Sequence, residues 1–520
     1  MSHARAVYRY HDGTKHHFTR FARSLGYLDW ASQPNPFRSF PGAPSVSLQP
    51  ASHQLSPIAA VLRHSLGLSA WKQFGQSRWS LRVNPSSGNL HPTEAYVIVG
   101  GEDGRVCHYA PDRHALEQRC AFDAPDWRQS ARAPMFLVAL TSVHWREAWK
   151  YGERAFRYCQ HDLGHAIAAV RIAASLHGLQ ARILPDWSHQ EMCALTGIDR
   201  EEDYLDAERE EPGCVLLIGD RMPVVSREHL LASIQRGRWT GHASQLSEDH
   251  VQWTIIDEIA AATRDFGQSQ LVPPVRPAPP ALPALPALPA YPAHLLLQRR
   301  SAVALDGCSS TSADSFFAIL ARALPSEAPP WDAVWWDARI HLALFVHRVD
   351  GVEPGLYLLV RHEPALVRLR EACRREFLWT RAHDALPLFL LARGDCRALA
   401  RRLSCDQDIA ADGFFSLGMI ADFDAALTTF GDRFYRHLFW ESGVVGQMLY
   451  LEAEAAGARG TGIGCFYDDP VHDVLGLRDH AFQSLYHFTI GIPVEDRRLT
   501  TAPGYEWEIA PRCETRSRSG

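Results

Sequence analysis

The chain has 520 residues, which is too long for one ordinary hydrophobic core, so at least two domains are expected. Apolar residues make up 46% of the chain and charged residues 22%, which is the composition of a folded globular protein. The formal net charge is -6, so the chain lacks the excess of positive charge that binds nucleic acid, and a nucleic-acid partner is not expected.

The sequence carries no targeting or membrane signal that we recognise. Its first residues lack the apolar stretch of a signal peptide, and it has no run of eighteen uncharged apolar residues that could span a bilayer. Eleven cysteines are scattered without a C-x-x-C motif. We therefore expect a cytoplasmic protein with reduced thiols, no membrane association, no disulfide framework and no metal site.

A proline-rich segment divides the chain. Residues 271–293 contain nine prolines in twenty-three positions. Because proline has no amide hydrogen and a fixed φ, this segment cannot join a helix or an inner strand, and it should act as a semi-rigid spacer. The predicted organisation is an extension (1–45), a first module with a helical C-terminal extension (46–270), the linker (271–293) and a second module (294–520).

The two flanks of this linker resemble each other at a constant offset of 279 residues. GERAFRY at 152–158 aligns with GDRFYRH at 431–437, and the same offset relates Gly164 to Gly443 and Gly197 to Gly476. Several matches in one register are not expected by chance, so the sequence predicts a tandem duplication.

The repeated stretches are predicted as buried helices. Apolar residues recur at helical spacing from Leu163 to Ala174 and from Val444 to Ala455. Strands are predicted at 95–100, 214–219, 341–346 and 485–491, each a short run rich in β-branched and aromatic residues. Helices and strands thus mix within each half, which predicts an α+β fold.

Three short motifs are candidates for ligand binding. NPSSGN at 84–89 is a polar turn in which Pro85 fixes φ and Gly88 permits φ > 0, while Ser86, Ser87 and Asn89 offer hydroxyl and amide groups. On its own, a surface turn is the commoner interpretation of this pattern.

QRRS at 298–301 opens the second module. Arg299 and Arg300 provide forked donors suited to phosphate, and Ser301 adds a hydroxyl, although a solvated basic patch would look the same. The third motif, GTGIGC at 460–465, follows a helix and so is not a Rossmann loop, but Gly462 and Gly464 would let the backbone pass close to a flat ligand.

Together these motifs resemble the nitroreductase family, in particular its SagB-type branch of thiazole- and oxazole-forming dehydrogenases. The resemblance covers nearly the whole chain, including KYGERAFRYCQHDLGHA at 150–166. It implies an intramolecular pseudo-dimer of two fused modules that share FMN.

The resemblance also implies the residues that would hold FMN. Arg299 and Ser301 would bind the phosphate and ribityl end, Pro85, Ser86, Ser87 and Asn89 would reach it from the first module, and Gly462 and Gly464 would pass beside the ring. The position where the family often has a third basic residue is Val303, so Arg82 or Arg300 is expected to compensate.

A pseudo-dimer of two such modules would have a second, symmetry-related flavin site, but its motifs are degraded in this sequence. The segment that corresponds to NPSSGN is DAVWWD at 332–337, which contains no Ser, Gly or Asn. Arg38 and Ser39 could be a remnant of its other half, but nothing in the sequence partners them. One flavin site per chain is therefore expected.

The same resemblance identifies Lys150 and Tyr151 as a candidate catalytic pair that accepts the substrate proton. A buried lysine can act as a base near neutral pH, with the tyrosine as relay. Their counterparts at the offset of 279 are Thr429 and Phe430, so the pair occurs only in the first module. A surface lysine before a core tyrosine is the structural alternative.

These observations predict an FMN-dependent oxidoreductase that acts on a small molecule or a modified peptide. Two alternatives stay open: a nitro or quinone reductase that uses NAD(P)H, and a non-catalytic scaffold with a decayed flavin fold. The sequence names neither the substrate nor the electron donor or acceptor.

Overall fold

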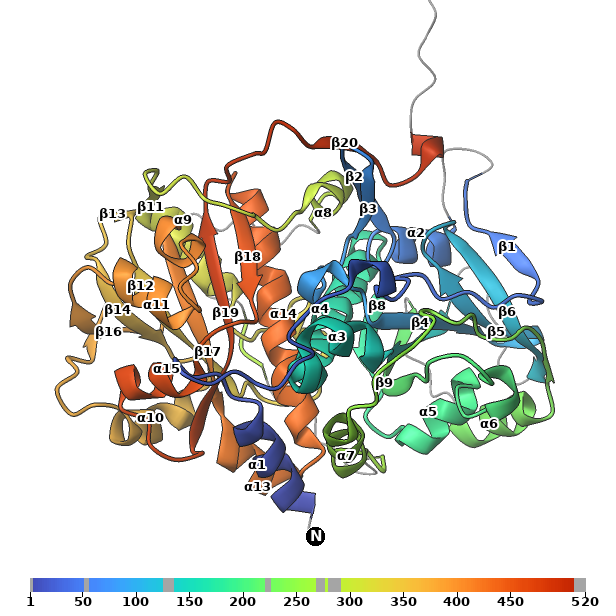
Figure 1. The fold of residues 1–520 in the computed structure, drawn as a ribbon. Coiled ribbons are helices and arrows are strands. Elements are labelled where there is room, and N and C mark those ends of the chain that lie inside the picture. Colours follow the sequence, from blue (N-terminus) through green and yellow to red (C-terminus); the bar gives the residue numbers. More distant parts are fainter. Residues whose placement is uncertain are drawn as a thin grey trace, which may run out of the picture.

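We analysed a computed structural model of the chain, which describes residues 3–50, 56–124, 135–219, 226–267, 276–278 and 291–508. The ribbon has two lobes that meet along a pair of long helices (Figure 1). Within the described ranges, none of the helices combines the length and the apolar character needed to cross a bilayer.

The first lobe is built on a sheet with the strand order β1-β6-β5-β4-β7-β9-β8, and a short strand, β10, pairs with β6. Its strands are β1 (Ser45–Ser47), β4 (Thr93–Val99), β5 (Gly101–Ala110), β6 (Ala115–Ala124), β7 (Met135–Ser142), β8 (Gln180–Ile183), β9 (Glu211–Gly219) and β10 (Arg238–Trp239). The strands predicted at 95–100 and 214–219 lie in β4 and β9, so both are confirmed.

The second lobe repeats this arrangement with the order β15-β16-β14-β12-β17-β19-β18. Its strands are β12 (Ile340–Val346), β14 (Gly355–Leu359), β15 (Thr380–Arg381), β16 (Leu388–Arg393), β17 (Phe415–Asp422), β18 (Arg459–Ile463) and β19 (Phe482–Gly491). The order β6-β5-β4-β7-β9-β8 corresponds strand by strand to β16-β14-β12-β17-β19-β18. The predicted strands at 341–346 and 485–491 are confirmed in β12 and β19. A small parallel pair, β11 (Thr311–Ser312) and β13 (Val349–Asp350), lies beside this sheet.

Helices surround both sheets, so the predicted α+β class is confirmed (Figure 1). In the first half they are α1 (His3–Gly13), α2 (Pro57–Arg63), α3 (His144–Tyr151), α4 (Ala155–Leu176), α5 (His189–Thr196), α6 (Arg227–Gln235) and α7 (Thr254–Ala262). In the second they are α8 (Ala293–Gln298), α9 (Ala313–Arg322), α10 (Leu366–Ala372), α11 (Arg397–Leu403), α12 (Ile409–Asp412), α13 (Phe423–Phe430), α14 (Phe434–Ala455) and α15 (Asp468–Leu475).

The central helices α4 and α14 pack against each other between the lobes (Figure 1). Both have 22 residues, and their first residues, Ala155 and Phe434, are 279 positions apart. The helices cross at Gly164 and Gly443, where a Cβ on either glycine would lie 2.2 Å from a backbone oxygen of the other helix. Both predicted buried helices are thus confirmed, and only glycine allows so close a crossing.

Each end of the chain contacts the lobe that is formed by the other half of the sequence. Near the N-terminus, α1 packs against α7 of the first half and also reaches the second lobe, where the Tyr8 hydroxyl donates to Asp424 at 2.7 Å. Near the C-terminus, β20 (Thr500–Pro503) pairs with β2 (Leu68–Phe74), which in turn pairs with β3 (Ser77–Arg82). Figure 1 shows this sheet at the top, where the red C-terminal strand lies on the blue hairpin. The N-terminal helix therefore connects to the second lobe, and the C-terminal strand connects to the first.

Most of the proline-rich segment 271–293 lies outside the described residues, which include only 276–278 and 291–293 of it. The spacer conformation predicted for this segment therefore stays a prediction, as do the module boundaries at its two ends.

Candidate functional site

A cavity of about 760 Å³ lies where the two lobes meet. Eleven of the twelve predicted site residues line it: Arg82, Pro85, Ser86, Ser87, Asn89, Tyr151, Arg299, Arg300, Ser301, Gly462 and Gly464. The twelfth, Lys150, is not in the wall, but its Nζ lies 3.3 Å from the place that a Cβ on Gly88 would occupy. The structure thus brings together segments that are more than 370 positions apart in the sequence, from Pro85 to Gly464.

The turn at 84–89 is held by the central helix α4. Ser87 donates to the Asp162 carboxylate from its backbone N (3.0 Å) and from its Oγ (3.1 Å). Asn89 donates from Nδ2 to the Ser80 carbonyl at 2.9 Å, and its Oδ1 lies 2.9 Å from His91 Nε2. The side chains of Ser87 and Asn89 are therefore already engaged with the protein, so any ligand meets a pre-organised turn rather than free side chains.

Two buried carboxyl groups lie beneath this turn, and the sequence did not reveal them. Glu147 on α3 and Asp162 on α4 are both buried, and Ser86 Oγ is 3.5 Å from Glu147 Oε1. Burial raises the pKa of Asp162 to about 7. Burial, and then the negative charge of Asp162, raise the pKa of Glu147 well above its ordinary value. Because two adjacent buried carboxylates repel each other, the pair retains a proton near neutral pH.

Lys150 and Tyr151, at the end of α3, reach the same turn from the side. A Cβ on Gly88 would lie 2.6 Å from Tyr151 Oη, and Gly88 has a φ of +61°. Burial, with the nearby Glu147, raises the pKa of Tyr151 well above its usual value, so its phenol stays protonated. Lys150 is half-buried rather than buried as expected. Its Nζ lies 5.3 Å from the centre of the Tyr151 ring and 6.0 Å from that of the exposed Trp30.

Arg299 crosses from the second lobe to the first. It is buried, and it donates from Nε to the Val83 carbonyl (3.0 Å) and from Nη2 to the Arg82 carbonyl (3.1 Å). Its Nη1 is also buried but has no hydrogen-bond partner within the described ranges. The guanidinium lies 4.9 Å from the centre of the Tyr450 ring, and the Tyr450 hydroxyl is 2.8 Å from Ser301 Oγ.

The two arginines expected to assist are also bound to backbone carbonyls, although the buried Nε of Arg82 has no partner among the described residues. Arg300 donates to the carbonyls of Leu297 (2.7 Å) and Ser69 (3.0 Å), and Arg82 donates to the Pro36 carbonyl at 2.5 Å. Their guanidinium groups therefore secure the backbone around the cavity. Two cations that the sequence did not indicate, Lys72 and Arg459, also line its wall.

The glycines of GTGIGC make room for aromatic side chains. A Cβ on Gly462 would lie 2.0 Å from Tyr486 Oη, and one on Gly464 would lie 2.3 Å from Tyr158 Cε1. Both tyrosines line the cavity. Glycine is thus required because tyrosine side chains fill the space beside the β18 edge strand.

The region of the molecule that corresponds to this cavity at the offset of 279 residues is filled by side chains. The corresponding pocket measures about 20 Å³ and is lined by Trp335 and Trp440. At the offset of 279, Gly462 and Gly464 correspond to Ile183 and Pro185, which also line that small pocket.

In this filled region, one carboxylate makes backbone contacts like those of Asp162. Glu441 corresponds to Asp162 and accepts from the backbone N of Arg339 (2.9 Å) and Ile340 (3.2 Å). Arg38 has a structural role, since its guanidinium donates to the carbonyls of Glu208 and Ser244. Glu441 thus holds a backbone turn as Asp162 does, while the space beside it is filled by side chains.

Comparisons with known proteins agree with this architecture. No family model matches the chain. A Methanocaldococcus jannaschii protein named as a nitroreductase is 33% identical over 107 residues, which are 18% of this chain and 53% of that protein. The chain therefore spans about half the length of this curated relative.

Solved structures extend the likeness. A crystal structure from Anabaena variabilis, described as that of a nitroreductase, matches with a TM-score of 0.71 at 21% identity over 94% of this chain and 99% of that chain. The E. coli microcin synthetase complex matches 41% of this chain and 77% of that chain with a TM-score of 0.30 at 18% identity. The Anabaena match shows that this chain has a nitroreductase-like α+β fold.

Proposed function

We propose that the protein is an FMN-dependent oxidoreductase that binds one flavin in the cavity between two fused nitroreductase-like modules. The convergence of the 84–89 turn, the 299–301 segment and Gly462–Gly464 on one cavity carries this proposal. The resemblance to the SagB-type branch supports the same assignment.

The residues present fit FMN. The buried Nη1 of Arg299 lacks a partner among the described residues, and a phosphate would supply a charged acceptor for it. Ser301 adds a hydroxyl, and Lys72 adds positive charge to the wall, whereas Arg459 is paired with Glu454 (3.3 Å) and Glu495. The cavity volume of about 760 Å³ is within the range usual for cofactor sites. Tyr158, Tyr450 and Tyr486 provide flat apolar surface for an aromatic ring.

FMN, when bound, would supply two-electron transfer to or from the substrate. The protein would then position the substrate and move its proton. Tyr151 keeps its proton over Gly88, so it would donate a hydrogen bond into the cavity, and Lys150, whose Nζ reaches the same glycine, would be the member of the pair that accepts the substrate proton. The buried Glu147 and Asp162 fix the 84–89 turn from below and position Ser86 and Ser87.

We further propose that the chain is a tandem duplication folded as a pseudo-dimer, with modules at 46–270 and 294–520. The matching order of six strands in the two large sheets and the equal length of α4 and α14, which begin 279 positions apart, support this assignment. The filling, by Trp335 and Trp440, of the region that corresponds to the cavity supports a single site per chain.

We propose a small molecule or a modified peptide as the substrate. A nitro or quinone reductase that uses NAD(P)H is the second candidate, and the name of the Methanocaldococcus relative favours it. Hydride transfer from NAD(P)H to the bound flavin, measured in single-turnover experiments, distinguishes the two: a rapid, saturable reduction supports the reductase.

The decisive experiment is a flavin count. The protein is saturated with FMN, freed of unbound flavin by gel filtration and denatured, and the released flavin is quantified against protein. We expect one FMN per chain. Two per chain would contradict the single site, and none would leave only a scaffold role.

A further inference from the structure

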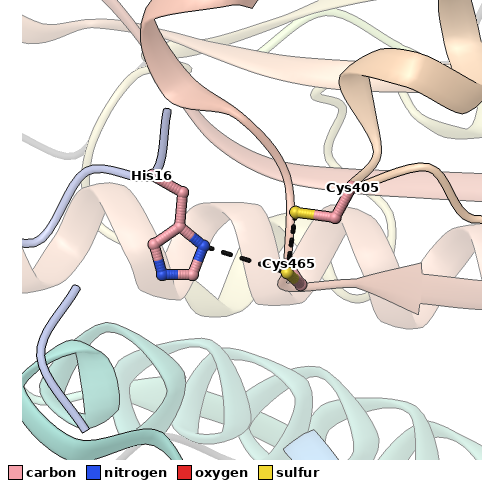
Figure 2. Close-up of side chains that lie close together, drawn as sticks. All are labelled: His16, Cys405 and Cys465. Atoms are coloured by element: carbon pink, nitrogen blue, oxygen red, sulfur yellow. Dashed lines mark hydrogen bonds between the residues drawn. The ribbon is translucent and has the colours of Figure 1, made fainter. Parts of the chain in front are cut away.

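One cluster of metal-binding side chains lies beside the cavity and has no role in the proposed flavin site. It consists of His16, Cys405 and Cys465, which come from the N-terminal segment, the loop after α11 and the loop after β18. Figure 2 shows the three side chains converging. Cys465 Sγ lies 2.7 Å from Cys405 Sγ and 3.8 Å from His16 Nδ1, and the three candidate ligand atoms all lie within 4.8 Å of one another.

The two cysteine loops are built to face each other. Cys405 and Asp406 have φ values of +55° and +58°, which side-chain-bearing residues rarely adopt. Two hydrogen bonds tie the loops together: Tyr467 N donates to the Leu403 carbonyl (2.9 Å), and Gln407 Nε2 donates to the Cys465 carbonyl (3.1 Å). The strained backbone at Cys405 thus places its sulfur against that of Cys465.

The histidine is fixed to the same region through its backbone. His16 N donates to Asp468 Oδ2 at 2.8 Å, and Asp468 N donates to the His16 carbonyl at 3.0 Å. Asp468 is buried and is held in turn by Arg154 (3.0 Å) and Arg157 (2.9 Å). His16, itself buried, is therefore anchored by its main chain while its ring points at the sulfurs.

We propose that His16, Cys405 and Cys465 bind one Zn²⁺ ion. Two thiolates and one imidazole are a ligand set that zinc prefers, and the two thiolates neutralise its charge. Three protein ligands leave the fourth tetrahedral position for water. Because Zn–S bonds are about 2.3 Å long, the sulfurs in such a site lie roughly 3.7 Å apart. Metal binding would open the present pair by about 1 Å, within the reach of side-chain rotation.

The site would have two consequences for the molecule. It would join the N-terminal segment, which carries His16, to two loops of the second lobe. It would also lie at the wall of the cavity, because Cys465 and Gln407 line that cavity. At the offset of 279 the counterpart of Cys465 is Asp186, so this cysteine is not repeated in the first half.

The experiment measures metal binding directly and does not depend on flavin. Protein is stripped with a chelator under a thiol-free reductant and titrated with Co²⁺. We expect one Co²⁺ per chain, with a thiolate-to-metal charge-transfer band and the intense visible bands of a tetrahedral site, both abolished by one equivalent of Zn²⁺. Protein purified under reducing conditions should contain one zinc per chain by elemental analysis.

Variants test the assignment of the ligands. Cys405→Ser, Cys465→Ser and His16→Ala should each weaken Co²⁺ binding by more than the roughly 10–100-fold that loss of a supporting residue costs. Cys308→Ser is the matched control, because Cys308 is an exposed cysteine outside the cluster, and its metal content should be unchanged. Far-ultraviolet circular dichroism establishes that each variant is folded.

Three results would overturn the proposal. The first is wild-type protein that takes up no Co²⁺ or Zn²⁺ under reducing conditions. The second is a Co²⁺ complex without the thiolate band, or one retained by the double variant Cys405→Ser, Cys465→Ser. The third is a Cys405–Cys465 disulfide found by peptide mapping in metal-free protein purified with reductant.

Discussion

At the scale of single residues, the most informative group is Arg299, which holds two carbonyls of the first lobe and keeps one buried N–H without a partner in the described part of the chain. If that N–H binds the FMN phosphate, Arg299→Ala removes a charge-assisted hydrogen bond worth about 1.5–3 kcal/mol. We expect the Kd for FMN to rise by roughly ten- to a hundredfold, measured by the quenching of flavin fluorescence.

Arg393→Ala is the control for this variant, because the exposed Arg393 pairs with Glu353 on the surface of the second lobe. Its FMN affinity should equal that of the wild type. An unchanged FMN affinity in folded Arg299→Ala would remove Arg299 from the site.

The second prediction concerns Lys150 and Tyr151, which flank Gly88 at the cavity. Lys150→Ala and Tyr151→Phe should keep FMN, because neither residue is assigned to its binding. Turnover of the true substrate should fall by on the order of a hundredfold or more, the usual effect of losing a positioned acid or base. Full activity of Lys150→Ala on that substrate would return the pair to a structural role.

The third prediction follows from the buried carboxyl of Asp162, whose pKa is raised from 3.8 to about 7. Because the folded state holds this proton more tightly than the unfolded state, the stability contributed by protonated Asp162 is present at low pH and is lost as the pH rises to about 7. Between pH 5 and 7 the loss is on the order of 2 kcal/mol.

Asp162→Asn removes this titration. Its melting temperature relative to the wild type should therefore rise between pH 5 and pH 8, whatever the absolute effect of losing the carboxylate contacts to Ser87. Asp314→Asn removes an exposed carboxyl instead, and it should show no such trend. A difference between Asp162→Asn and wild type that is constant with pH would contradict the assignment.

The sequence revealed some residues of this site and concealed others for physical reasons. The 84–89 turn is visible because proline and glycine mark a turn, and polar side chains at a turn suggest a ligand. Glu147 and Asp162 carry no such mark, since each is one acidic residue within a helix. His16, Cys405 and Cys465 have no spacing motif, and the fold alone brings them together.

At the scale of elements, the contact between α4 and α14 determines how the lobes meet. A Cβ on Gly164 would lie 2.2 Å from the Trp440 carbonyl oxygen, and the backbone of α14 cannot yield locally. We expect Gly164→Ala to destabilise the protein by on the order of 3 kcal/mol or more, which lowers its melting temperature. Gly13→Ala is the control, because no atom lies within 4 Å of its Cβ position. Equal melting temperatures for the two variants would contradict this prediction, because they would show that the crossing of α4 and α14 accommodates a Cβ.

Elements were predictable where the pattern is local. The long helices repeat apolar residues every three or four positions, and a glycine in the left-handed region follows each: Gly178 has a φ of +71° and Gly457 a φ of +73°. The sheet of β2, β3 and β20 was not predicted. Its register joins Ala70 to Pro503, and a strand that pairs across such a sequence distance has no local signature.

At the scale of the whole molecule, both chain ends interlock the lobes. The His11 ring lies 2.9 Å from Gln483 Oε1 of the second lobe, and the Tyr505 hydroxyl donates to the Pro111 carbonyl of the first lobe at 2.7 Å. Together with the buried contact of α4 and α14, these contacts hold the halves, and Arg276 of the proline-rich segment adds hydrogen bonds to the carbonyls of Val334 (2.7 Å) and Trp336 (3.1 Å) in the second lobe. We therefore expect the halves to stay together when the chain is cut within residues 281–290.

This argument leads to the last prediction. A specific protease site is placed within residues 281–290, and the cleaved protein is analysed by size-exclusion chromatography with light scattering. Two bands should appear in denaturing electrophoresis, while the native mass stays that of the intact chain and FMN stays bound, because the cavity wall comes from both halves. Cleaved Gly443→Leu is the contrasting variant, since its side chain would collide with the backbone of α4 and should let the halves separate. Separation of the cleaved wild-type protein into two folded halves would show that the linker, and not the interface, holds the lobes together.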